Sequence, residues 1–118
     1  MNDTKYLKHY DSFICSSVTV PQTFFQRAKG LLGKKYISQD EAIFFSDCSS
    51  IHMFGMQISL DIVFLDREFR IVKMVENLKP WRLAWCNKAQ HTLEMASGSV
   101  SKHGFSMDDK LRIKEYTR

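Results

Sequence analysis

The run from Cys48 to Met56 gathers the residue types that could carry out chemistry. It holds the thiol of Cys48, the hydroxyl of Ser50 and the imidazole of His52, and the carboxyl of Asp61 follows shortly afterwards. A thiolate paired with histidine is a nucleophile, and a carboxylate that orients an imidazole produces a general base. Cys48, His52 and Asp61 are therefore the candidate catalytic residues.

The spacing of these residues limits what they can do together. On an extended chain, Cys48 and His52 lie about 13 Å apart, at about 3.3 Å per residue, which is too far for a hydrogen bond. His52 and Asp61 can meet only if the chain bends back at residues 54–56. In the alternative interpretation, Asp61 caps a turn that leads into the next strand.

An aromatic segment at residues 78–86 is the strongest binding feature. Pro80 disfavours a regular strand, and Trp81 and Trp85 with the neighbouring Arg82 could present stacking surfaces. We expect a ligand-binding surface formed by Ser50, His52, Asp61, Trp81 and Arg82. The alternative is that one tryptophan plugs the end of a small barrel.

One acidic residue, Glu94, interrupts the apolar stretch 93–96. Because burying an unpaired carboxylate is costly, we expect a structural ion pair with an arginine, either Arg27 or Arg82. The four histidines show no helical or hairpin spacing typical of metal ligands, so no metal and no cofactor are expected.

Composition bounds the class of protein. The chain has 118 residues, 44% of them hydrophobic, which predicts one domain over residues 1–118. It contains neither a signal-like apolar segment nor a run of about 20 apolar residues, so we expect a cytoplasmic protein without membrane insertion. The three cysteines form no C-x-x-C pair, which favours reduced thiols.

The basic excess is mild, with 17 Lys and Arg against 13 Asp and Glu. Lys110, Arg112 and Lys114 alternate with Leu111 and Ile113, so they would line one face of a strand. We interpret this stripe as a solvated strand face and expect no nucleic-acid partner.

Hydrophobic patterning predicts an α+β fold. The Thr19-x-x-Gln22 capping box with Pro21 predicts one helix near the N-terminus, ending at Gly33. The predicted strands are residues 42–45, 51–54, 58–65, 69–75, 92–96 and 111–113. We expect a mainly antiparallel, small barrel-like or sandwich sheet of five to six strands. Residues 61–65 are placed at its centre, in a hairpin with residues 69–75, and residues 98–103 are expected to form a helical turn.

Several motifs together resemble the domain-of-unknown-function 192 family. They are Arg27-Ala28-Lys29-Gly30-Leu31-Leu32-Gly33, the run from Cys48 to Met56, Leu60-Asp61-Ile62-Val63-Phe64-Leu65-Asp66, Leu78-Lys79-Pro80-Trp81-Arg82, Leu93-Glu94 with Gly98, and Asp109. The resemblance spans residues 19–113 and is to the short form of the family, without a leader segment. It implies a compact, mostly β fold with an early helix, and no established reaction. The family usually has glycine where Phe69 stands, so we expect the positive-φ turn to be lost and the hairpin to be wider here.

Two function hypotheses follow from these residues. The preferred one is a non-enzymatic binding or accessory module that recognises a small molecule, a protein or a peptide. The alternative is a small hydrolase-like or proton-transfer enzyme that uses His52 with Asp61 or Cys48.

Overall fold

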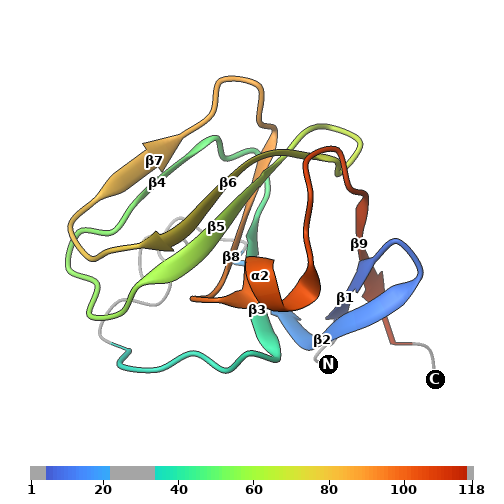
Figure 1. Cartoon of the computed structure of the whole chain (residues 1–118), viewed down its shortest axis with the longest axis horizontal. Coiled ribbons are helices and arrows are strands. Elements are labelled where there is room, and N and C mark those ends of the chain that lie inside the picture. The colour runs from blue at the N-terminus through green and yellow to red at the C-terminus, as the bar shows by residue number, and fades with distance from the viewer. Residues whose placement is uncertain (1–4, 22–33, 117–118) are drawn as a thin grey trace.

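The structure, a computed structural model, describes residues 5–21 and 34–116. Within these residues the chain is mainly β, with one short helix near its C-terminal end (Figure 1). The elements are β1 (Lys5–His9), β2 (Ser12–Thr19), β3 (Glu41–Phe45), β4 (Ser50–His52), β5 (Leu60–Leu65), β6 (Ile71–Leu78), β7 (Leu83–Trp85), β8 (His91–Ala96), α2 (Ser99–His103) and β9 (Leu111–Glu115).

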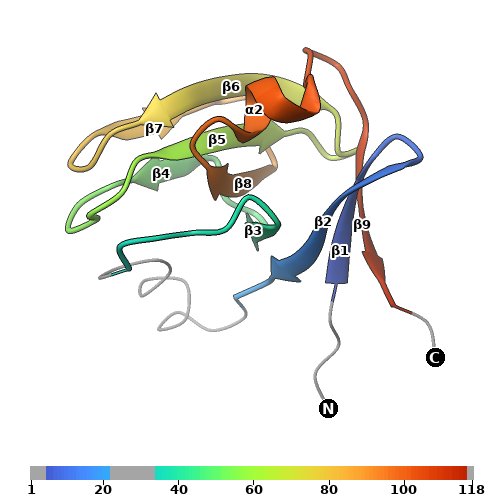
Figure 2. The same cartoon turned by 60° about the horizontal axis from the view of Figure 1, so that its bottom comes forward.

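Seven of the strands form one mixed sheet in the order β6-β5-β8-β3-β2-β1-β9. Its neighbouring strands are antiparallel except for the parallel pair β2 and β3. The sheet curls until its two outermost strands meet at one end, where Arg70 and Lys110 form an isolated bridge (Figure 2). The expected barrel-like form is thus closed at that end only. β4 and β7 make a separate two-stranded sheet.

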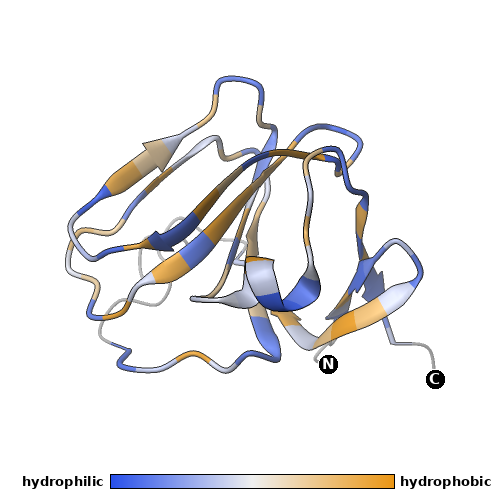
Figure 3. Cartoon of the chain, viewed as in Figure 1, coloured by the Kyte–Doolittle hydropathy of each residue, from blue (hydrophilic) through white to orange (hydrophobic). Residues whose placement is uncertain are grey.

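β5 explains why the sheet has two apolar sides. All six of its residues are buried, and hydrophobic residues predominate along it (Figure 3). Val63 and Leu65 face a cluster inside the curl that includes Leu7, and Ile62 and Phe64 face a second cluster. A strand covered on both sides has this continuous apolar character. β5 is an interior strand, as expected, but the middle of the sheet is β3.

The small sheet covers the second cluster. Ile51 of β4 and Ala84 of β7 are buried there with Ile62 and Phe64 of β5. The outer side of the small sheet consequently faces away from the core.

The strand predictions are confirmed for all six segments, with shifted ends, but five to six strands were too few. The predictions omitted β1, β2 and β7, because Lys, His and Ser residues interrupt the first two and Pro80 suggested an aromatic loop for the third. The helical turn at residues 98–103 is confirmed as α2. The helix predicted near the N-terminus falls on residues 22–33, which lie outside the described residues.

The turn between β5 and β6 corrects one expectation. Phe69 has a φ of 64°, so the positive-φ position is kept although glycine is absent. The turn is tight, since Phe69 N–H donates to the Asp66 carbonyl at 3.0 Å and Asp66 Oδ1 accepts from Glu68 and Arg70. The Phe69 ring stacks on Phe44 with 5.3 Å between centroids.

Candidate binding site

The small sheet turns one of its sides to solvent. Ser50 pairs with Trp85 and His52 pairs with Leu83 across β4 and β7, and all four residues are exposed. Because side chains alternate along a strand, these four share the outer side while Ile51 and Ala84 face the core. The outer side is therefore a row of one hydroxyl, one imidazole and two large apolar groups.

Two further aromatic residues extend this row. The His52 ring stacks on Phe54 with 5.0 Å between centroids, and Phe54 stacks on Trp81 at 6.0 Å. The exposed fractions are 48% for Phe54, 68% for Trp81, 52% for Leu83 and 56% for Trp85. We call the surface of Ser50, His52, Phe54, Trp81, Leu83 and Trp85 the aromatic face.

Trp81 occupies a strained backbone position. Its φ is 68°, in a turn where Arg82 N–H donates to the Lys79 carbonyl at 3.2 Å. Pro80 is the second residue of this turn and Trp81 the third, and a third residue with positive φ is usually glycine. For a bulky residue the left-handed conformation costs about 1–2 kcal/mol.

The strained turn is hydrogen-bonded to Met53, the residue directly after β4, through the backbone. Met53 N–H donates to the Arg82 carbonyl at 2.7 Å, and its own carbonyl accepts from Trp81 N–H at 2.8 Å. These bonds hold the Trp81 ring beside Phe54. The Arg82 side chain is exposed at the same turn, and no partner for its guanidinium is found among the described residues.

A cation lies at the other end of the aromatic face. Lys73 Nζ donates to the Trp85 carbonyl at 2.8 Å and lies 5.8 Å from the centre of the Trp85 ring. A cation over an indole fixes the ring and leaves positive potential at its border. The aromatic face is thus mostly apolar, carries the Ser50 hydroxyl and the His52 imidazole, and has Lys73 at one end and Arg82 at the other.

Asp61 lies apart from the aromatic face. Its side chain is fully buried, and its oxygens accept from the backbone N–H groups of Asn77 at 2.8 Å, Gly98 at 3.1 Å and Val100 at 2.9 Å. These bonds tie β6 and the start of α2 to β5. Asp61 therefore binds backbone N–H groups of β6 and of the start of α2, rather than capping a turn that leads into β5. Among the described residues it makes no hydrogen bond to His52.

Cys48 also acts locally. Its thiol donates to the Ser50 carbonyl at 3.1 Å, and its own carbonyl accepts from the Thr92 hydroxyl at 2.7 Å. His52 instead stacks on Phe54, so the described contacts assemble no thiol and imidazole pair. All three cysteines are free, and burial, followed by the charge of Asp40, raises the pKa of Cys15 to about 12.

Glu94 is buried on β8 between residues of the second core cluster. It lies opposite Ile43 on one side and Ile62 on the other, and burial raises the pKa of its carboxyl to about 7. Among the described residues Arg82 forms no ion pair with Glu94. Arg27 lies outside the described residues, so its ion pair with Glu94 stays a prediction. Within the described residues, no three His, Cys, Asp or Glu side chains form a group that could hold a metal ion.

The structure excludes the alternative considered for the tryptophans and adds residues that the sequence reasoning missed. Trp81 and Trp85 are exposed, so neither plugs the barrel end. Phe54 and Leu83 were not singled out. The pattern Leu83-Ala84-Trp85, which alternates large, small and large residues, was the available signal for a strand with one apolar outer side.

Comparison with known proteins places the chain in a family. The model of DUF192, described as an uncharacterized ACR, matches residues 7–113. The chain belongs to DUF192. A similar protein is UPF0127 protein PH1112 of Pyrococcus horikoshii, which is 39% identical over an alignment of 71 residues. The alignment covers 56% of this chain and 59% of that protein. The match thus spans little more than half of the relative's length.

Two solved structures share the DUF192 chain's fold at 20% identity and a TM-score of 0.78. One is a protein of unknown function from Novosphingobium aromaticivorans, and the likeness covers 92% of this chain and 83% of that one. The other is from Sinorhizobium meliloti and was proposed to be a transcription regulator; here the coverage is 92% and 90%. At this identity the likeness shows the fold alone. No helix in the described residues is long and apolar enough to cross a membrane.

Proposed function

We propose that this DUF192 domain is a non-enzymatic binding module that captures an apolar segment of a protein or peptide on the aromatic face. The observation that carries the proposal is the exposure of four large apolar side chains, Phe54, Trp81, Leu83 and Trp85, on one continuous surface. Contiguous exposed apolar surface of this kind marks interaction sites in soluble proteins.

The strain at Trp81 strengthens the proposal. Strained backbone persists where the surrounding structure holds it, and such positions cluster at binding sites. The ring is 68% exposed, and it stacks on Phe54 with 6.0 Å between centroids, while Phe54 is itself half exposed. Tryptophan also gives much contact area with little conformational freedom to lose, which suits it to anchor a partner.

The chemistry of the aromatic face indicates what kind of segment it prefers. Its centre is apolar and aromatic, and the Lys73 and Arg82 cations stand at its two ends. We expect aliphatic or aromatic residues to pack at the centre and carbonyl or carboxyl groups to lie near the ends. The enzymatic alternative gains no support from the described contacts, because the Asp61 and Cys48 side chains are engaged with backbone groups.

Selection from a displayed peptide library tests this function. The full chain is used as bait, and binding of the enriched peptides is then measured by tryptophan fluorescence. Trp81→Ala and Trp85→Ala should each weaken binding by about 30-fold, as for a buried aromatic anchor. The matched control is Tyr36→Ala, which removes an aromatic side chain that is 74% exposed outside the aromatic face.

Three outcomes would contradict the proposal, and the first two concern the peptides themselves. One is a library that yields no binder, and the other is a binder whose affinity is unchanged by both tryptophan substitutions. A loss of affinity in the Tyr36 control equal to that in the tryptophan variants would also contradict a specific site. Far-UV circular dichroism of each variant separates these results from misfolding.

A further inference from the structure

A second candidate site lies on β9, at one edge of the seven-stranded sheet and away from the small sheet of β4 and β7. β9 is the last strand of the order and pairs with β1 along one edge. Its other edge meets the β5–β6 turn only at its beginning, where Leu111 N–H donates to the Phe69 carbonyl at 3.0 Å. Beyond Leu111, no strand among the described residues pairs with this edge.

The hydrogen-bond pattern shows which backbone groups are left open. Tyr10 N–H donates to the Lys110 carbonyl at 2.9 Å, whereas Leu111 N–H points to Phe69 on the opposite side. Since backbone groups alternate between the two edges of an antiparallel strand, Ile113 and Glu115 direct theirs to the open edge. No backbone partner for these groups is found in the described part of the chain.

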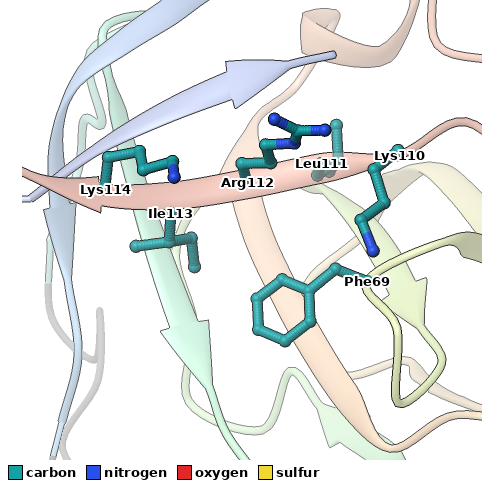
Figure 4. Close-up of a pocket in the computed structure, with 6 residues that line it drawn as sticks. All are labelled: Phe69, Lys110, Leu111, Arg112, Ile113 and Lys114. Atoms are coloured by element: carbon teal, nitrogen blue, oxygen red, sulfur yellow. The ribbon is translucent and has the colours of Figure 1, made fainter. Parts of the chain in front are cut away.

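A hollow of about 350 Å³ lies against the same strand (Figure 4). It is lined by Phe69, Lys110, Leu111, Arg112, Ile113 and Lys114. Figure 4 shows the Phe69 ring and the Ile113 side chain on the same side of β9, with Lys110 pointing toward that side. The hollow therefore offers apolar contacts next to unpaired backbone groups.

The charged side chains that line the hollow are all cationic, while Lys110 Nζ also donates to the Glu68 carbonyl and Glu115 follows on the same strand. No acidic residue is among its lining residues, whereas three are cationic. Arg112 reaches Asp11 at 3.8 Å, but the Asp11 side chain is 92% exposed, so the pair is weak. Arg112 also lies opposite Lys8 across the β1–β9 pair, which adds positive charge.

We propose that β9 binds an acidic peptide segment, which adds to its open edge as an extended strand. The backbone of the segment would hydrogen-bond to Ile113 and Glu115, an apolar side chain would enter the hollow, and acidic side chains would meet Lys110 and Lys114. Strand addition takes affinity from the backbone and specificity from alternate side chains. This site is separate from the aromatic face and does not depend on the function proposed for it.

Two other occupants fit less well. A second copy of the chain, paired β9 against β9, would bring the lysine and arginine side chains of the two copies together, which is unfavourable. A nucleic acid would satisfy the cations but has no peptide groups for the open edge. Cationic side chains on an edge strand disfavour pairing with other strands. An acidic strand is the exception, because its carboxylates neutralise these cations.

Fluorescence anisotropy with a labelled eight-residue peptide that alternates glutamate and valine tests the proposal. The wild-type chain should bind it, and Lys114→Glu should weaken binding by about tenfold or more through charge reversal. The matched control is Lys88→Glu, an exposed lysine in the turn before β8, which should leave binding unchanged. Trp81→Gly should also bind as the wild type does.

A pair of peptides separates strand addition from simple charge attraction. One peptide is N-methylated at its odd-numbered residues and the other at its even-numbered residues. Only one of the two peptides therefore keeps the N–H groups that face β9. One should bind as the parent does and the other should fail. Equal binding of both, or no binding of the parent, would overturn the proposal. So would tighter binding of oligothymidylate with a steep salt dependence, or a dimer in solution that Lys114→Glu dissociates.

Discussion

Phe69 and Trp81 are two aromatic residues in the same unfavourable backbone conformation, with φ values of 64° and 68°, but their rings have opposite surroundings. The Phe69 ring packs between Phe44 and His91, with centroid distances of 5.3 and 5.0 Å. The Trp81 ring stays 68% exposed and leans only on Phe54. The Phe69 ring thus packs within the fold, whereas the Trp81 ring faces solvent.

The difference teaches where to look for a partner. At Phe69, core packing offsets the strain of the turn. A third aromatic residue with positive φ, Tyr10, is also engaged, because its hydroxyl donates to Asp109 and its ring contacts His9. At Trp81 the contacts within the fold are weak, so we attribute the choice of tryptophan there to binding.

The largest expected effect concerns Glu94. Like Phe69 and Trp81 it is in an unfavourable situation, in this case a carboxyl group buried in the core. Burial raises its pKa from 4.5 to about 7, so the folded state binds the proton more tightly than the unfolded state. Stability from this group is complete below about pH 4.5 and is lost as the pH rises through about 7, by up to about 3 kcal/mol. Glu94→Gln should therefore stabilise the protein at pH 8 and have little effect at pH 4.5.

Urea denaturation of the wild type and of Glu94→Gln at both pH values measures this difference. The control is Glu76→Gln, at an exposed position of β6, which should change stability little at either pH. Destabilisation by Glu94→Gln at pH 8 would contradict the expectation that burial alone sets the pKa of the Glu94 carboxyl. It would instead favour the ion pair with Arg27.

The second largest expected effect tests whether core packing of the Phe69 ring offsets the strain of its backbone. Phe69→Ala removes a partly buried ring and keeps the strain, so we expect a loss of about 2–3 kcal/mol. Phe69→Gly removes the ring and the strain together, so its loss should be about 1 kcal/mol smaller. Urea denaturation measures both.

Arg67 supplies the matched control for Phe69. It is exposed in the same turn and is not among the residues with positive φ. At this position Gly should be less favourable than Ala, the reverse of the order at Phe69. The same order at both sites would show that Phe69 bears no strain.

Local patterns in the sequence predicted the parts of the fold that depend on them. The apolar run of β5, the hairpin to β6 and the turn at α2 were visible from composition and spacing. The hairpin of β1 and β2 was missed, because its place in the sheet depends on pairing with β9, about a hundred residues away in the chain. Polar residues obscure its alternation.

The candidate site was predicted in part. Ser50, His52 and Trp81 do lie on one surface, as expected. The role of Asp61 could not be read from the sequence, since its three hydrogen-bond donors come from residues 77, 98 and 100. The sequence also does not show on which side of a strand pair Trp85 lies, because the register with Ser50 decides this.

Trp81→Gly tests the central claim most directly, although its effect on stability is the smallest. Glycine relieves the positive φ, and the lost ring makes few contacts, so the free energy of unfolding should rise by about 0.5–1 kcal/mol. Trp81→Ala keeps the strain and should be less stable than Trp81→Gly by about 1 kcal/mol.

The decisive measurement combines urea denaturation of Trp81→Gly with its affinity for a peptide selected on the wild-type chain. The account predicts a variant that is at least as stable as the wild type and binds the peptide about 30-fold more weakly. A variant that is clearly less stable, or that binds as the wild type does, would contradict the claim that Trp81 serves a partner rather than the fold.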